Sequence, residues 1–266
     1  MSSAAVGAAI APALLQGALV ALPRGDALEF LRRLRSPAWA AALPGAIVVG
    51  TFAPLGARSL ALGIVLLAAL ATPPLAVVAV LAVVRGPRVA LVGLALAAGL
   101  VAAFAGGPSG ELSGTILTAL GALAVGAALA RLIPFGWVLV GFTCMCAVDV
   151  GFLAAGLGQP AAVDIAQAAG HVPGSLFDHA QLGRVSLDYP DLVLSAVLGG
   201  FMAGQPGQRW AAAMVSVLAA ASLVFAPPHA VWPATVPVAM TLIALRTLGL
   251  PRQPETHALG AEAPAV

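Results

Sequence analysis

The sequence has no lysine, only two cysteines and one tyrosine, and few charged residues of any kind. Charged residues make up 8% of the 266, against about 25% in an ordinary soluble domain, while apolar residues make up 61%. Water cannot be the main solvent of such a chain, because there is too little polar surface to cover it. The composition therefore predicts an integral membrane protein.

The few arginine, cysteine and histidine side chains argue against a nucleic-acid-binding protein, a disulfide-rich protein and a metalloprotein. All 12 cationic residues are arginines that are scattered among connections, so no basic patch can follow phosphates and we expect no nucleic-acid partner. Cys144 and Cys146 lie two apart in an apolar stretch, which fits neither a disulfide framework nor a zinc site. We interpret them as small packing residues. His171, His179 and His229 lack metal-ligand spacing, so we expect no metal and no cofactor.

Apolar runs of about 20 residues, the length that crosses a hydrocarbon core about 30 Å thick, recur between short polar breaks. Alternating strand patterns are absent, so the predicted fold is all-α. Pro73 and Pro74 interrupt the third run, but each half is too short to cross alone, which favours one kinked span. The nine predicted spans are residues 3–22, 38–57, 60–84, 88–106, 112–130, 134–157, 188–204, 210–226 and 230–246.

The arginine distribution provides a check on this count, because arginine concentrates on the cytoplasmic side of a membrane. With nine spans and the amino terminus outside, only Arg58 and Arg184 fall outside. The other ten lie on the cytoplasmic side: Arg24, Arg32, Arg33, Arg35, Arg85, Arg88, Arg131, Arg209, Arg246 and Arg252. This bias predicts an external amino terminus and a cytoplasmic carboxyl terminus. The abundance of Ala, and of Arg without Lys, favours a prokaryotic plasma membrane.

The predicted organisation has three parts. Residues 1–131 form a five-span amino-terminal part, and its first span is retained, because no positive region precedes it as in a cleaved signal peptide. Residues 132–250 form a four-span part that contains the longest polar connection, about 158–187, on the outer side. Residues 251–266 form a disordered cytoplasmic tail.

Two carboxylates lie within predicted spans, where a charge is costly and indicates a function. Asp149 is about 12 Å of helix from the outer end of the sixth span, and Asp191 is a few residues into the seventh from the same side. Consecutive antiparallel spans can bring both to a similar depth. Neighbouring carboxyls share a proton, so one can act as a base toward water and the other as an acid toward a peptide carbonyl.

Each aspartate also has another interpretation. An intramembrane carboxylate such as Asp149 can be a proton relay, a cation ligand in a transporter or a helix-packing partner. Asp191 directly follows Pro190, and an acidic residue there is common in the first turn of a helix. The pair alone does not identify a protease.

Joined with a later proline element, these residues resemble the presenilin and signal peptide peptidase family, which has one Asp in span six, one in span seven and a Pro-Ala-Leu motif at span nine. Residues 146–149 (CAVD) resemble the Tyr-Asp motif of the family. Residues 187–191 (LDYPD) occupy the position where the family has a Leu-Gly-x-Gly-Asp run. Residues 196–200 (AVLGG) are similar to the small and apolar run after the presenilin aspartate. Residues 232–237 (WPATVP) match Pro-Ala-Leu at its first two positions. The resemblance covers roughly residues 140–246.

The resemblance implies an intramembrane aspartyl protease with Asp149 and Asp191 as its catalytic dyad. It assigns substrate binding to the start of the ninth span, at Pro233, Ala234 and Thr235. The implied substrates are transmembrane helices or signal peptides in the bilayer, and the oligomeric state stays open. The predicted orientation resembles that of signal peptide peptidase and is opposite to that of presenilin. We therefore expect substrates whose amino terminus lies in the cytoplasm.

The chain departs from the family at Val148, Asp188, Pro190 and Thr235, where the family has Tyr, two Gly and Leu. An active protease and a non-catalytic relative both fit this pattern. Two other classes remain: a proton-coupled transporter in which Asp149 carries the proton, and a membrane scaffold. A prepilin-type peptidase also uses membrane aspartates, but the late Pro-Ala element and the small cytoplasmic loops fit it less well.

Overall fold

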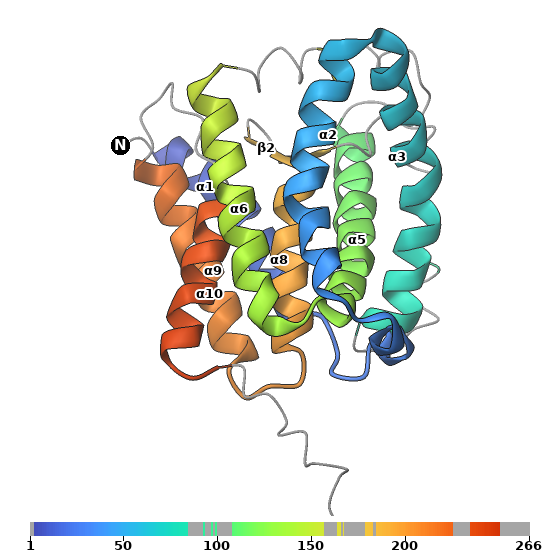
Figure 1. The fold of residues 1–266 in the computed structure, drawn as a ribbon. Coiled ribbons are helices and arrows are strands. Elements are labelled where there is room, and N and C mark those ends of the chain that lie inside the picture. The colour runs from blue at the N-terminus through green and yellow to red at the C-terminus, as the bar shows by residue number, and fades with distance from the viewer. Residues whose placement is uncertain are drawn as a thin grey trace, which may run out of the picture.

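The structure, a computed structural model, describes residues 3–84, 108–156, 179–182, 185–225 and 235–250, together with residues 93, 97, 99, 164, 165 and 167. The described part is all-α apart from one short hairpin, and its helices run up and down in one bundle (Figure 1). Most of the predicted span 88–106 and the whole predicted tail lie outside the described residues, although residues 93, 97 and 99 are helical.

The helices begin and end within a few residues of predicted spans, because each follows one apolar run. Short 3-10 helices, η1 (Glu29–Leu34) and η2 (Pro37–Ala41), join the first two, and a π-helical turn (Ala79–Val83) follows the third. The α-helices are α1 (Ser3–Ala21), α2 (Ala42–Gly56), α3 (Arg58–Val78), α5 (Pro108–Leu132), α6 (Phe135–Ala154), α8 (Tyr189–Met202), α9 (Gln208–Phe225) and α10 (Thr235–Thr247).

Four helical runs of the described part are long and apolar enough to cross a membrane, which indicates a multi-pass membrane protein. They are Pro37–Gly56, Arg58–Val83, Ser109–Leu132 and Phe135–Phe152. The remaining apolar helices are shorter: α8 has 14 residues and α10 has 13. At 1.5 Å per residue each spans only about 20 Å, against a hydrocarbon core of about 30 Å.

The third run stays helical through Pro73 and Pro74, as the sequence predicts. The α-helix ends at Val78 and continues as the π turn to Val83, so Arg58–Val83 is one helical run of 26 residues. The two prolines lack the N–H groups of two helix hydrogen bonds, yet the rest of the ladder continues on both sides. This confirms a single continuous run in place of two short ones.

Helix α8 forms the centre of the bundle, and its residues from Leu192 to Gly200 are buried. It packs against α1 and α5, while α9 packs against α1. A Cβ at Gly126 of α5 would collide with Ala196, and one at Gly199 would collide with the backbone of α1 at Leu19. The absence of side chains at these two glycines therefore lets three helix backbones approach closely, as in other membrane bundles.

A hairpin lies at one end of the bundle and leads directly into α8. Strand β1 (His179–Leu182) pairs antiparallel with β2 (Val185–Asp188), and His179 lies opposite Asp188. Strand β1 packs against α5. These strands lie mostly within the polar connection predicted at residues 158–187, where the sequence predicts no strand.

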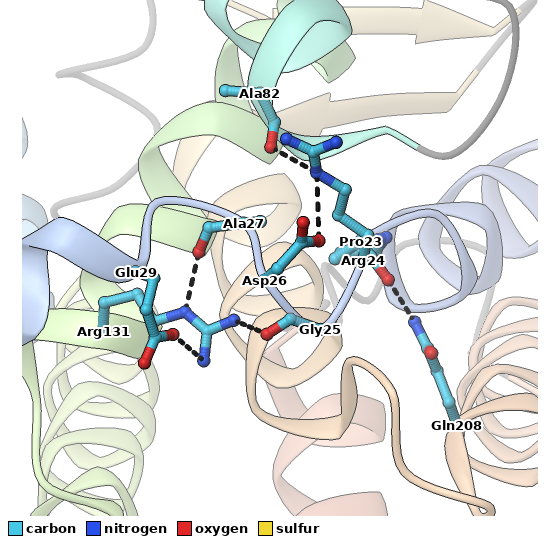
Figure 2. Close-up of polar contacts among 9 residues, drawn as sticks. All are labelled: Pro23, Arg24, Gly25, Asp26, Ala27, Glu29, Ala82, Arg131 and Gln208. Carbon is cyan, nitrogen blue, oxygen red and sulfur yellow. Dashed lines mark hydrogen bonds and ion pairs between the residues drawn. The ribbon is translucent and has the colours of Figure 1, made fainter.

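The opposite end is held by polar side chains that bind the connection after α1 (Figure 2). Arg131, at the end of α5, donates to the carbonyls of Ala27 (2.8 Å) and Gly25 (2.6 Å) and lies 3.8 Å from the Glu29 carboxylate. Its side chain is only 9% exposed, so this buried charge has two backbone carbonyls and one carboxylate as partners.

Two further side chains bind the same connection. The Gln208 amide, in the first turn of α9, donates to the carbonyls of Pro23 (2.9 Å), Val20 and Ala21, which the end of α1 leaves without helical partners. Arg24 donates to the Ala82 carbonyl at 2.9 Å. We call Arg24, Arg131 and Gln208 the polar clasp, since together they tie the π-helical turn after α3, the end of α5 and the start of α9 to the connection after α1.

Candidate functional site

The predicted acid Asp149 lies on α6, five residues before the helix ends at Ala154, at the same end of the bundle as the hairpin. That distance is about 7.5 Å along the axis. Its side chain is half-buried. Helix α6 packs against α2 on one side and α10 on the other. The carboxylate therefore lies near the hairpin end of a largely apolar helix.

Thr235, the last residue of the predicted substrate-binding element, contacts this acid directly. Its hydroxyl donates to Oδ2 of Asp149 at 3.1 Å, and the residue is only 1% exposed. Thr235 is the first residue of α10, whose first turn contains Pro237. Proline is tolerated there because first-turn N–H groups have no helical acceptor. Pro233 and Ala234 lie outside the described residues.

The second predicted acid, Asp191, is the third residue of α8 and is half-buried at the same end of the bundle. Its position after Pro190 suits the start of a helix, where a carboxylate interacts favourably with exposed N–H groups. The Ser195 hydroxyl donates to the backbone carbonyl of Asp191 at 3.3 Å. From Leu192 onward α8 is buried, so Asp191 lies where the buried core begins.

Cys146, on α6, is a further group near Thr235. Its thiol interacts with the Thr235 side chain and electrostatically with both Asp149 and Asp191. The prediction that both cysteines are small packing residues did not place Cys146 beside Thr235. The spacing contained the signal, because residues three apart share one face of a helix and Cys146 lies one turn before Asp149. Cys144, two residues away, is exposed.

Helix α10 brings these groups together. It packs against α6, α8 and α9, whereas α6 and α8 have little direct contact with each other. The two aspartates therefore do not meet through pairing of their own helices. Helix α10 contacts both helices and contributes Thr235 to Asp149.

The site combines two half-buried carboxylates, a buried hydroxyl and a thiol. A carboxylate has several acceptor positions, so Asp149 can bind a water molecule while it accepts the hydrogen bond from Thr235. Among the residues that the structure describes, no three His, Cys, Asp or Glu side chains converge as a metal site requires.

No known protein family, curated protein or solved structure matches the chain.

Proposed function

We propose that the chain is an intramembrane aspartyl protease of the presenilin and signal peptide peptidase type, with Asp149 and Asp191 as its dyad. The observation that supports this most directly is the hydrogen bond from Thr235 to Asp149. The resemblance pairs a ninth-span element with a sixth-span acid, and these two residues are 86 positions apart in the chain. The Cys146 thiol, which interacts with the Thr235 side chain, adds a second group from α6 to the same site.

The proposed topology has nine spans, with the amino terminus outside and the carboxyl terminus in the cytoplasm of a prokaryotic plasma membrane. Its support in the described residues is the arginine distribution. Arg58 is the first residue of α3, and α3 begins at the hairpin end of the bundle (Figure 1). The other end holds the connection after α1, the end of α5, the start of α9 and the end of α10, which contain Arg24, Arg32, Arg33, Arg35, Arg131, Arg209 and Arg246. Arginine concentrates on the cytoplasmic side, so the hairpin end faces outward.

The proposed reaction is hydrolysis of one peptide bond. The ionised carboxylate takes a proton from water, and the resulting hydroxide attacks the carbonyl carbon while the protonated carboxyl donates to the carbonyl oxygen. The tetrahedral intermediate then breaks its C–N bond, and the departing nitrogen takes a proton. The products are a carboxylate and an amine. An intact substrate helix hides its carbonyls in hydrogen bonds, so it has to unwind first.

The substrates we propose are single transmembrane helices or signal peptides whose amino terminus lies in the cytoplasm. The orientation of the dyad on α6 and α8 relative to the arginine-rich end supports this direction. Reversing the direction of a cleaved model helix should abolish its cleavage. Equal cleavage in both directions would contradict the proposed substrate orientation.

The test of the dyad is cleavage of labelled transmembrane peptides by the purified full-length chain in lipid. We expect Asp149→Asn and Asp191→Asn each to abolish cleavage, because each removes one ionisable partner at almost unchanged volume. Asp26→Asn is the matched control, since Asp26 is an exposed carboxylate at the opposite end. Cleavage that survives either dyad substitution would overturn the assignment.

A proton-coupled transporter is the second candidate, and the half-buried position of Asp149 favours it as well. The same purified protein in sealed vesicles distinguishes the two. Proton uptake that depends on Asp149, in the absence of peptide cleavage, would favour transport. Cleavage without proton movement favours the protease.

A further inference from the structure

The connection between α1 and α2 presents apolar side chains to the outside of the bundle. Phe30 and Leu34, on η1, are 69% and 62% exposed, and Trp39 on η2 is 42% exposed. The Trp39 indole N–H donates to the Leu34 carbonyl at 3.2 Å, which links the two short helices. We call residues 29–39 the interfacial segment. A ring with a polar N–H and a flat apolar face favours the boundary between headgroups and acyl chains.

Three exposed arginines lie among these apolar side chains. Arg32 pairs with Glu29 at 2.6 Å, whereas Arg33 and Arg35 form no ion pair within the part of the chain that the structure describes. Burial and the neighbouring Arg32 charge both lower the pKa of Arg35. The cluster therefore has more positive charge than its own carboxylate offsets, and an added anion would relieve the repulsion.

The polar clasp holds this segment at one level of the bundle. Arg131 reaches Glu29 at the start of η1, and the Ser36 N–H donates to the Leu132 carbonyl at the end of α5 at 2.9 Å. The candidate spans Pro37–Gly56 and Ser109–Leu132 begin and end beside the segment. Its exposed residues therefore lie where membrane spans meet the bilayer surface.

We propose that the interfacial segment binds an anionic phospholipid of the bilayer. Phe30 and Leu34 enter the boundary between headgroups and acyl chains, and Arg33 and Arg35 bind the phosphate. Short basic segments beside a span attract anionic headgroups, and exposed apolar residues add burial in the interface. The proposal is independent of the protease proposal, since no residue of the segment belongs to the candidate functional site.

The test measures lipid binding to the detergent-solubilised full-length chain by native mass spectrometry. Phosphatidylglycerol, phosphatidylcholine and soluble glycerol phosphate are compared. We expect the wild type to prefer phosphatidylglycerol, and Arg33→Gln with Arg35→Gln to weaken its binding about 25-fold, at about five-fold for each arginine. The double variant Phe30→Ser with Leu34→Ser should weaken the binding of both phosphatidylglycerol and phosphatidylcholine. Arg58→Gln, which removes an exposed arginine at the opposite end, should bind like the wild type.

Three outcomes would overturn the proposal. They are equal affinity for the two lipids, unchanged affinity in the double arginine variant, and binding of glycerol phosphate as tight as that of phosphatidylglycerol. The last would indicate a site for free phosphate in which the acyl chains take no part. Size-exclusion chromatography and thermal unfolding check that each variant is folded. The Phe30 and Leu34 variant decides the matter if the arginine variant does not fold.

Discussion

The two ends of the bundle use polar groups in opposite ways. At the clasp end, Arg131 and Gln208 each bind two or more backbone carbonyls, and both side chains are buried. At the hairpin end, Asp149 is half-buried and, among the described residues, its side chain has a single hydrogen bond, from Thr235. Arg131 and Gln208 therefore each hold several buried partners, whereas Asp149 keeps acceptor capacity.

This difference indicates where stability and reactivity reside. Removal of the buried Arg131 guanidinium should lower the free energy of unfolding, because the carbonyls of Gly25 and Ala27 would lose their donor. A carboxylate with spare acceptor positions can bind water or a substrate at little cost to the fold. Substitutions at the clasp should therefore affect unfolding strongly, and substitutions at the hairpin end should affect it weakly.

The largest expected effect comes from Arg131→Met, which removes the charge at similar length. The carbonyls of Gly25 and Ala27 would lose their donor, so we expect the free energy of unfolding to fall by about 3 kcal/mol. Thermal unfolding in mild detergent measures this. Arg58→Met is the matched control, because Arg58 is exposed and should change stability little. An equal loss of stability in both variants would contradict the stronger contribution of the clasp end to stability.

Gly199→Ala tests the packing that joins the ends. The added methyl group would meet the backbone of α1 at Leu19 and Val20, which cannot move aside as a flexible side chain can. Overpacking of this kind costs about 1–3 kcal/mol. Gly63→Ala is the control, because a Cβ at Gly63 meets nothing within 4 Å. The same unfolding measurement should show a loss for Gly199→Ala only.

Gln208→Leu should lower the free energy of unfolding by about 1–2 kcal/mol. The carbonyls of Val20, Ala21 and Pro23 would lose their shared amide donor at the end of α1. Gln208→Glu keeps the shape but also removes the donor, so it should be at least as unstable. Wild-type stability in the glutamate variant would show that the hydrogen bonds contribute little.

The smallest expected effect on stability is that of Thr235→Val, about 0.6 kcal/mol, the average for a hydrogen bond between membrane helices. Its effect on peptide cleavage should be larger, because Asp149 loses the donor that orients it. Thr235→Ser keeps the hydroxyl and should restore cleavage. If the valine variant cleaves like the wild type, Thr235 has only a packing role.

Much of the fold follows from the sequence, because each long apolar run can satisfy its backbone in a membrane only as a helix. The single run through Pro73 and Pro74 follows from length alone. The hairpin before α8 does not, since four-residue strands within a polar connection leave no distinctive pattern. The clasp is equally hidden, because its acceptors are backbone carbonyls up to 188 residues away from Gln208 in the chain.

The candidate site also combines features that the sequence predicts with contacts that depend on the tertiary structure. The sequence by itself determined that Asp149 and Asp191 are candidate site residues, since carboxylates stand out in apolar runs. It also identified Thr235 as part of the element at the ninth span. Only the tertiary structure decided that Thr235 binds Asp149 and that the Cys146 thiol interacts with the Thr235 side chain. Those contacts depend on how α10 packs against α6 and α8, and long-range packing of this kind has no local sequence pattern.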